Sequence, residues 1–408
     1  MTPVTPPDLN IPPSPSTVSV SAIDTTSRIY GVHTDHFLDP PIEGHGRLAG
    51  PAYSFLIQHP KLGRRLLFDL GIRKDFENLA RPIAEILRQK PVPRVVVDKD
   101  VRQILEENNV DPASIEAVVW SHHHFDHTGD PSRFDPETKL IVGPGFSEAM
   151  LPGYPANPES TILQTDYEGR ELHELDFEGG NGGRYKTLKI GRFGALDYFG
   201  DGSLYLLDSP GHAVGHLCAL ARVSASADGT GKSSFVFLAG DAFHHAGEIR
   251  PSEYLPIPER IEPSPFSPLG CCGSSCPGSI FDKILRREGH PEETGAFYGA
   301  PRTNSLHHDL DETIVTFGKL QEADCRDEVL MCAAHDESLL EVVDFFPNAT
   351  LDNFSEKGWV KQARWRFLSD FGRAVGMDCP TRCRTGSASR AARCSTGSWP
   401  APWDPSWC

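Results

Sequence analysis

The segment SHHHFDHTGD, residues 121–130, decides the interpretation of this chain. Six of its ten residues are potential metal ligands. It directly follows the apolar run IEAVVW, residues 115–120. A β-branched run that ends in His and Asp is typical of a buried strand that presents ligands at its C-terminal tip. The segment therefore predicts a metal site and not a polar loop on the surface.

The spacing within this segment indicates more than one metal ion. Residues i and i+2 of an extended chain point the same way, so His122 and His124 can bind one metal while His123 points elsewhere. If the chain then turns, Asp126 and His127 face a neighbouring point. This arrangement suits two metals a few ångströms apart that share one bridging water.

Three later fragments also place a ligand-type residue after an apolar strand. LLDSPGH ends at His212, VFLAGD ends at Asp241, and VLMCAAHD contains His335. Each fragment alone is a weak signal. Ligands at the ends of several strands converge at one edge of a sheet, so the four tips together predict one site.

The composition narrows the possible partners. The 408 residues carry a formal net charge of −17, which disfavours binding to nucleic acid or to an anionic membrane. The longest apolar runs have the length of strands and not of a membrane span. We therefore expect a small-molecule substrate, with no nucleic acid and no membrane as partner.

The cysteines and the N-terminal segment indicate the compartment. The ten Cys show no disulfide-framework spacing, and the N-terminus has no secretory signal. Both observations predict a cytoplasmic protein.

Three regions follow from the pattern along the chain. Residues 1–27 are rich in Pro, Ser and Thr, which predicts a disordered lead or an extended arm on a neighbouring surface. Residues 28–372 alternate strands and helices, as in an α/β layered domain. Residues 373–408 have no periodicity and are expected to form a disordered tail.

Within the domain we predict several strands and helices. The strands 53–57 and 65–71 form a hairpin, and further strands lie over 139–142, 204–207, 217–223 and 235–238. Helices are predicted over 75–89 (divided near Pro82), 98–108, 310–323 and 337–345.

The order of these motifs resembles the metallo-β-lactamase fold superfamily. The resemblance rests on His122-x-His124-x-Asp126-His127, followed by His212, Asp241 and His335, and it covers about residues 28–370. It implies a four-layer αββα sandwich with a dinuclear site at one edge of the paired sheets. It also implies two Zn²⁺ per chain: the first held by His122, His124 and His212, the second by Asp126, His127 and His335, and both bridged by Asp241. His216 is then expected to contact the ligands and not the metal.

These ligand types suggest a hydrolase. Imidazole and carboxylate suit zinc, and zinc lowers the pKa of bound water to about 7. Our hypothesis is that a bridging hydroxide attacks the carbonyl of a lactone or related ester. Asp126 is the catalytic residue that passes a proton to the leaving group.

Details of the motif select among relatives. Flavodiiron proteins carry Glu where this chain has His124, and the true β-lactamases lack the bridging carboxylate of Asp241. Once these two groups are set aside, the motifs resemble those of the acyl-homoserine lactonases, of glyoxalase II, and of thioesterases and lactamases of fungal secondary metabolism. The strand end Phe68-Asp69-Leu70-Gly71 and the pair His335-Asp336 favour the lactonase-like group.

Alternative functions stay open at this point. One is a thioesterase that releases an acyl-carrier-bound polyketide. Another is a lactamase that opens a cyclic amide or carbamate in fungal secondary or xenobiotic metabolism. A non-catalytic binding module on the same fold is the third. The lactonases also place a Tyr shortly after the bridging Asp to contact the substrate carbonyl, and here His244 or His245 is the candidate for that contact.

Overall fold

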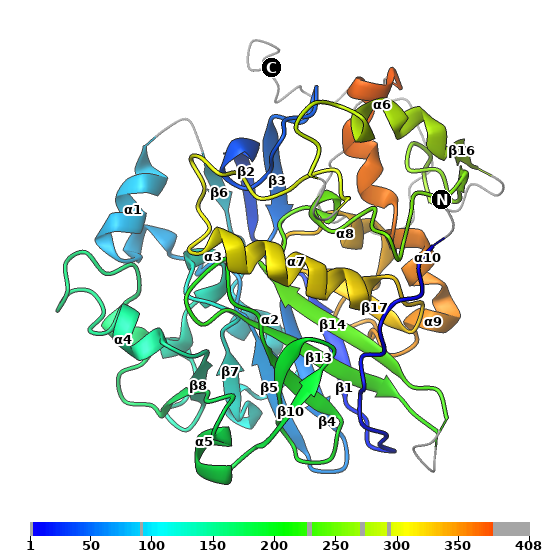
Figure 1. Ribbon diagram of the computed structural model, residues 1–408. Coiled ribbons are helices and arrows are strands. Elements are labelled where there is room, and N and C mark those ends of the chain that lie inside the picture. The colour runs from blue at the N-terminus through cyan, green and yellow to red at the C-terminus, as the bar shows by residue number, and fades with distance from the viewer. Residues whose placement is uncertain (1–2, 90–92, 227–230, 270–273, 292–294, 378–408) are drawn as a thin grey trace, which may run out of the picture.

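The computed structural model describes residues 3–89, 93–226, 231–269, 274–291 and 295–377. Two six-stranded sheets face each other, with helices on their outer sides (Figure 1). The α/β fold class and the four-layer αββα sandwich that the sequence predicts are confirmed.

The first sheet combines antiparallel and parallel strands. Its order is β1 (Ser19–Ile23), β4 (Ser54–His59), β5 (Arg64–Phe68), β7 (Ala117–Val119), β8 (Lys139–Val142) and β9 (Leu172–Glu174). β4 pairs antiparallel with both β1 and β5, whereas β5, β7, β8 and β9 run parallel. β4 and β5 form the predicted hairpin.

The second sheet is antiparallel except at one edge. Its order is β10 (Lys186–Ile190), β11 (Phe193–Asp197), β12 (Leu204–Asp208), β13 (Leu217–Ser224), β14 (Ser234–Gly240) and β17 (Val329–Ala333). Only the pairing of β17 with β14 is parallel. The strands predicted from residue 204 to residue 238 are confirmed.

Smaller elements surround the two sheets. A three-stranded sheet has the order β3 (Arg47–Pro51), β2 (Arg28–His33) and β6 (Arg94–Val96), and β15 (Arg260–Ile261) pairs with β16 (Cys276–Pro277). The helices are α1 (Arg81–Arg88), α2 (Val101–Glu107), α3 (Phe125–Thr128), α4 (Phe146–Met150), α5 (Gly180–Gly183), α6 (Asp282–Leu285), α7 (Leu310–Asp324), α8 (Ser338–Val342), α9 (Phe354–Lys357) and α10 (Trp359–Ala363).

The predicted helices are largely present. α2 and α7 lie within one to three residues of the predicted bounds. The stretch 75–89 is divided, as Pro82 predicts, into a 3₁₀ turn at Phe76–Asn78 and α1, with Pro82 in the first turn of α1. The helix predicted over 337–345 is shorter, because only Ser338–Val342 is helical. Among the described residues, no helix has the length and apolar character needed to cross a bilayer.

Apolar side chains from both sheets fill the space between them. Alternation along β4 shows the two faces, since Phe55 and Ile57 lie in this interior whereas Leu56 lies on the outer face. Burying a side chain of this size contributes about 1.5–3 kcal/mol. The interior also contains Val20, Phe68, Val119 and Ile141 of the first sheet and Leu206, Leu217, Val236, Leu238 and Leu330 of the second.

Helices cover the outer faces of the sheets. α2 packs Val101, Ile104 and Leu105 on the first sheet, and its N-terminus is capped by Asp100, which accepts a hydrogen bond from the Gln103 N–H (2.9 Å). α7 packs Phe317 and Leu320 on the second sheet. Asp309 caps α7 by accepting from the Glu312 N–H (3.0 Å).

The prediction of a disordered lead over residues 1–27 is wrong for the described part of that segment. Ser19–Ile23 forms β1 at the edge of the first sheet, and Val20 and Ile23 are fully buried. The pattern is weak in the sequence because the strand is short and lies among Pro, Ser and Thr. Its stability comes from pairing with β4 and from the core beneath it.

Residues 3–18 form the extended arm that the sequence offers as the alternative. The Arg222 guanidinium donates to the Pro12 carbonyl (2.6 Å), and the Gly191 N–H donates to the Leu9 carbonyl (2.6 Å). Arg326 holds the Pro7 carbonyl in the same way. Proline has no N–H but keeps its carbonyl, so a Pro-rich arm is held by donors from the surface that it crosses.

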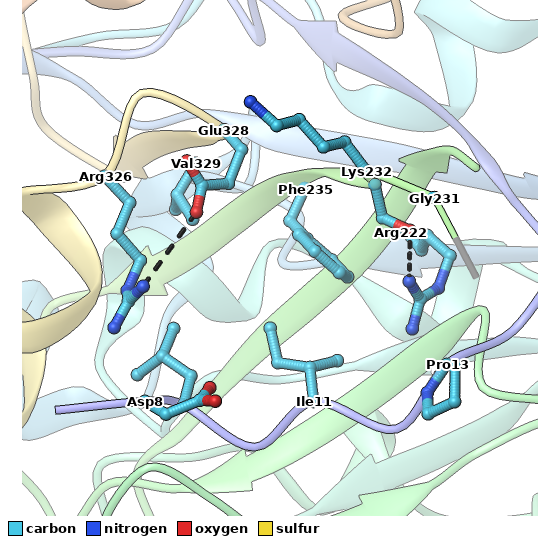
Figure 2. A pocket seen from close by; sticks show the side chains of 12 residues that line it. Asp8, Ile11, Pro13, Arg222, Gly231, Lys232, Phe235, Arg326, Glu328 and Val329 are labelled. Carbon is cyan, nitrogen blue, oxygen red and sulfur yellow. Dashed lines mark hydrogen bonds and ion pairs between the residues drawn. The ribbon is translucent and has the colours of Figure 1, made fainter. Parts of the chain in front are cut away.

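The arm borders a pocket of about 420 Å³. Figure 2 shows Ile11 and Phe235 among the residues that line it, with Arg222 and Arg326 on its sides. The Arg222 guanidinium lies 4.7 Å from the centre of the Phe235 ring. No predicted metal ligand lines this pocket, so it is distinct from the predicted site.

The C-terminal boundary lies near the end of the described residues. Arg373–Val375 forms a 3₁₀ turn, and Val375 packs against the core. The expected tail over 373–408 lies outside the described residues from position 378 onward. The division at residue 372 stays a prediction.

Candidate metal centre

The strand ends singled out in the sequence share one edge of the sandwich. β12 and β14 both pair antiparallel with β13, so they run in the same direction, and β17 runs parallel to β14. Their C-terminal ends precede His212, Asp241 and His335. The tip of β7 joins this edge because the Leu217 N–H donates to the Ser121 carbonyl (2.7 Å). The topology therefore brings all four tips together.

His122, His124 and His212 form a first cluster of imidazole nitrogens. His212 Nε2 lies 3.2 Å from His122 Nε2 and 3.0 Å from His124 Nδ1. His122 and His212 are buried, and His124 is partly exposed. An N–H of one neutral ring can donate to the nitrogen of another, but a cation can accept a lone pair from all three rings at once.

Asp126, His127 and His335 form a second cluster. His124 is extended, and the chain then turns into α3, so Asp126 and His127 face a different point from His124, as the sequence predicts. His335 Nε2 lies 3.4 Å from Asp126 Oδ2. Asp126 and His335 are partly exposed, so the clusters face solvent on the side of His124, Asp126 and His335.

Asp241 lies between the two clusters and contacts both. Its Oδ2 is 3.7 Å from His212 Nε2 and 3.9 Å from His122 Nε2. Its Oδ1 is 3.2 Å from His127 Nε2 and 3.2 Å from His335 Nε2. Each oxygen of this buried carboxylate thus faces one cluster.

The preceding Gly240 lets the chain approach the tip of β7. Its φ is +52°, and a Cβ at this position would lie 2.7 Å from the Ser121 Cβ. A residue with a side chain would therefore push the Asp241 backbone away from the His-rich segment.

The spacing of these atoms fits two metal ions. Tetrahedral ligands bonded to zinc at about 2.0–2.2 Å lie about 3.3–3.6 Å apart. The shortest separations within both clusters are 3.0–3.4 Å. His127 Nε2 and Asp241 Oδ1 make no hydrogen bond although they are buried and 3.2 Å apart. Their donor set of imidazole and carboxylate suits zinc.

The electrostatic surroundings of the clusters differ. Burial lowers the pKa of His124 to about 4, and burial together with neighbouring imidazoles holds the pKa of His122 and His212 well below the usual range. Burial also disfavours the charged form of His127, but the Asp241 and Asp69 carboxylates outweigh it and raise its pKa to about 10. The first cluster therefore favours neutral rings, and the carboxylates around the second favour positive charge, which a metal cation can supply in place of a proton.

Asp69 orients the ring of His127. Its Oδ2 accepts a hydrogen bond from His127 Nδ1 (2.9 Å), and its two oxygens accept from the Ser121 N–H (2.6 Å) and Oγ–H (2.8 Å). This leaves His127 Nε2 facing Asp241. Sequence reasoning gave Asp69 no role, although a carboxylate directly after β5, which runs parallel to β7, is the same signal that identified Asp241.

Two further contacts fix the ligand positions. His335 Nδ1 donates to the Pro51 carbonyl (2.6 Å), which leaves its Nε2 facing Asp126 and Asp241. His216 Nε2 accepts from the Asp241 N–H (3.1 Å), so His216 contacts the backbone next to the carboxylate, as the resemblance implies.

The structure separates the two candidates for substrate contact. His244 Nε2 lies 3.4 Å from Asp241 Oδ2, and its ring stacks on Phe37 at 3.9 Å. Neither ring nitrogen of His244 has a hydrogen-bond partner among the described residues. His245 turns away, because its Nδ1 accepts from the Gly247 N–H (3.1 Å) and its Nε2 faces Asp370 Oδ2 (3.4 Å).

His45, His245 and Asp370 form another group of potential ligands. The hydrogen bond from Gly247 requires an unprotonated Nδ1 on His245, so the ring proton is on Nε2, the atom that faces Asp370. A protonated nitrogen cannot bind a metal. His45 in turn hydrogen-bonds the Tyr298 hydroxyl through Nδ1 (2.7 Å). This group is therefore a structural contact between the loops and the C-terminal segment.

Comparison with known proteins identifies similar sequences and similar solved structures. Residues 47–220 match the model of the Metallo-beta-lactamase superfamily. The chain is 41% identical over 374 residues to Gamma-lactamase FDB1 of Fusarium pseudograminearum, a match that covers 90% of this chain and 85% of that protein. It is 42% identical over 374 residues to Metallo-hydrolase mfmC of Annulohypoxylon moriforme, covering 91% and 92%. The solved structure of an N-acyl homoserine lactone hydrolase with its product at the catalytic metal centre aligns with a TM-score of 0.49 and 16% identity, covering 82% of this chain and 99% of that one.

Proposed function

We propose a function for this chain, which belongs to the metallo-β-lactamase superfamily and is a metal-dependent hydrolase. It uses two zinc ions to open a cyclic carbonyl compound. The substrate is either a lactone or related ester, or a cyclic amide. The observation that carries this proposal is the position of Asp241. One of its oxygens faces His122 and His212, and the other faces His127 and His335.

In this proposal the seven side chains act as two sets of ligands that share Asp241. His122, His124 and His212 hold the first ion, and Asp126, His127 and His335 hold the second. Zinc bound there would supply a water molecule acidic enough to react near neutral pH and a positive charge beside the substrate carbonyl. The low pKa of the first three rings supports this assignment, because neutral imidazole is the form that binds metal.

Asp126 is the proposed proton carrier. Burial disfavours its carboxylate, but the hydrogen bond from His335 and the charge of His127 outweigh burial and lower its pKa. Asp126 is therefore a carboxylate at neutral pH. It is partly exposed on the open side of the clusters, where it can accept a proton from the attacking water and deliver it to the leaving oxygen or nitrogen.

His244 is the proposed contact to the substrate carbonyl. Its ring lies next to Asp241 and is held flat against Phe37, so a ring N–H can donate to an oxygen near the clusters. Neither ring nitrogen has a hydrogen-bond partner among the described residues, which supports this role. His245 is not assigned to it, since both of its ring nitrogens face other groups.

A cyclic amide is the candidate that the sequence comparison favours. The relative named gamma-lactamase is 41% identical and is covered over 85% of its length. Lactone and lactam opening need the same attack on a carbonyl and differ in the leaving atom, whose protonation matters more for nitrogen. Asp126 is placed to supply that proton in either case.

We expect the enzyme to act on a small molecule in the cytoplasm. Cys218, Cys276, Cys325 and Cys332 are free thiols, which agrees with a reducing compartment.

The proposal is tested by measuring zinc content and hydrolysis on one sample of the purified full chain. We expect two zinc ions per chain and opening of at least one class in a panel of lactones, cyclic amides and thioesters. Treatment with EDTA should abolish turnover, and added zinc should restore it. A metal-free chain that hydrolyses the panel equally well would contradict the zinc mechanism. Activity on thioesters alone would contradict the cyclic substrate.

A further inference from the structure

A loop far from the predicted ligands in sequence contacts the turn that carries His212. This loop, residues 305–309, precedes α7. The His308 N–H donates to the His212 carbonyl (2.9 Å), and the Asp309 N–H donates to the Gly211 carbonyl (2.8 Å). The backbone on both sides of the His212 side chain is thus held by the loop.

The first turns of α7 pack against the same turn. Thr316 Oγ1 donates to the Pro210 carbonyl (2.8 Å). Gly211 has a φ of +131°, and a Cβ there would lie 2.5 Å from the Thr313 backbone nitrogen. Such contact leaves no room for a side chain. The turn before His212 and the start of α7 therefore form one rigid unit.

The loop also reaches the ring of His212. His307 Nδ1 lies 3.3 Å from His212 Nδ1, and His307 is buried. The other nitrogen of His212, Nε2, faces His122 and His124. A nitrogen that binds metal carries no proton, so the proton of a neutral His212 is on Nδ1. His212 Nδ1–H then donates to an unprotonated His307 Nδ1.

This assignment also decides what His307 does not do. His307, His244 and Glu248 are close enough to be considered as a separate cation site. With its Nδ1 accepting from His212, the neutral ring of His307 carries its proton on Nε2. That nitrogen has no lone pair left for a cation, so His307 serves the His212 ring instead.

We propose that His307 is a positioning residue that fixes the orientation and proton placement of His212, and thereby sets the affinity of the first cluster for zinc. The inference rests on the proposed function, because it assumes zinc at His122, His124 and His212. Residues that hydrogen-bond the far nitrogen of a metal-binding His typically contribute about 10- to 100-fold in metal affinity.

The test compares zinc affinity of full-chain variants by competition with a fluorescent chelator. His307→Leu fills a similar volume but offers no hydrogen-bond acceptor to His212 Nδ1–H. The affinity of the first cluster for zinc should therefore fall by about 10- to 100-fold. His307→Asn places its Oδ1 near the position of Nδ1 and should stay within about threefold of the wild type, since the acceptor is kept. The visible spectrum of the Co²⁺-loaded leucine variant should also change, because the His212 ring is no longer held.

His308→Leu is the matched control. His308 is the exposed neighbour of His307, and its backbone N–H is kept in the variant, so zinc affinity should equal that of the wild type. If His307→Leu does not fold, His307→Gln replaces it. Glutamine places its polar atoms beyond the Nδ1 position and should also weaken zinc binding.

The outcomes separate this inference from the proposed function. Wild-type affinity in both the leucine and glutamine variants would overturn the role of His307 and leave the zinc site intact. Equal losses in the asparagine and leucine variants would also overturn it, because packing alone would then explain the effect. A wild-type chain that binds no zinc would overturn the proposed function itself.

Discussion

Two regions rich in ionisable side chains lie at the two ends of the segment 121–130, and they are built differently. The candidate metal centre contains His122, His124 and His127. The arginine cluster, which we define as Arg73, Asp130, Asp166 and Arg170, contains the last residue of the segment. In the arginine cluster opposite charges pair, as between Arg73 Nη2 and Asp130 Oδ2 (3.2 Å). In the metal centre, nitrogen faces nitrogen at 3.0–3.2 Å.

The two regions show how ionisable groups that stabilise the fold differ from ionisable groups that converge on a ligand. In the arginine cluster most donors meet acceptors within the protein: Arg170 donates to the carbonyls of Pro131, Phe134 and Thr138. Arg170 Nε, Arg73 Nη1 and Asp166 Oδ1 are its atoms without a hydrogen-bond partner among the described residues. In the candidate metal centre the ring nitrogens of His122, His124 and His212 converge on one point, as ligands of a cation do. Mutations in the first region should therefore affect stability, and mutations in the second should affect metal binding and turnover.

The largest effect is expected for Asp241→Asn. The amide nitrogen cannot bind a metal, so one of the two clusters loses its share of the bridging carboxylate. Zinc content should fall from two to at most one per chain, and turnover should fall by about 10³-fold, equivalent to about 4 kcal/mol. Metal analysis and initial rates measure both. Wild-type zinc content with wild-type turnover would contradict the role of Asp241.

Arg73→Met tests the arginine cluster. Removing this buried guanidinium leaves the Asp130 carboxylate unpaired, so the free energy of unfolding should fall by about 3–5 kcal/mol. Urea unfolding of the metal-free chain measures it, and zinc content of the folded variant should stay at two. Arg81→Met is the control: its ion pair with Glu85 is more than half exposed, so the loss should stay below about 1 kcal/mol. Equal losses in the two variants would contradict a structural role for the cluster.

Asp69→Asn sharpens the comparison because it changes a charge beside a ligand. An amide nitrogen opposite His127 Nδ1 would move the ring proton to Nε2, the atom that faces Asp241. Affinity for the second zinc should fall by about 10- to 100-fold in chelator competition. Asp201→Asn removes a similar contact to His59 (2.8 Å), which is not near the clusters, and should leave zinc affinity unchanged. If both variants bind zinc as the wild type does, Asp69 does not orient His127.

The smallest effect is expected for Asp166→Asn, and it depends on pH. Burial raises the pKa of Asp166 from 3.8 to about 7. Between these values the folded chain keeps a proton that the unfolded chain has lost, so the contribution to stability is present below about pH 4 and is lost as pH rises through 7. The asparagine variant lacks this loss.

Its Tm relative to the wild type should therefore rise by a few degrees between pH 5 and pH 8. Thermal unfolding at the two pH values measures the difference. The same Tm difference at both values would show that Asp166 does not titrate in this range.

The sequence predicts those parts of the molecule that depend on local pattern. The strands before the site are recognisable because β-branched and apolar residues form short runs, and each predicted ligand comes directly after such a run. The seven predicted residues lie at one edge in the structure because parallel strand directions bring their ends together. β1 was missed because Ser19–Ile23 is stabilised by β4 and by the core, and not by its own composition.

His307 has no signal that a single sequence offers. It lies among Ser, Leu and Asp, without a preceding strand, and its partner His212 is 95 residues away. Only the packing of α7 on the Gly211 turn brings the two rings together. Asp69 could be predicted in part from the sequence. Its position after β5 follows the pattern of the ligands, but its hydrogen bond to His127 depends on the adjacent β7.

The most direct test of two zinc ions is anomalous diffraction at the zinc edge from crystals of the zinc-loaded full chain. We expect two peaks. The first should lie about 2.0–2.2 Å from His122 Nε2, His124 Nδ1 and His212 Nε2, and the second at the same distance from His127 Nε2 and His335 Nε2, with Asp241 between them. A map with no peak at these nitrogens, or with zinc only at another group of residues, would contradict the account.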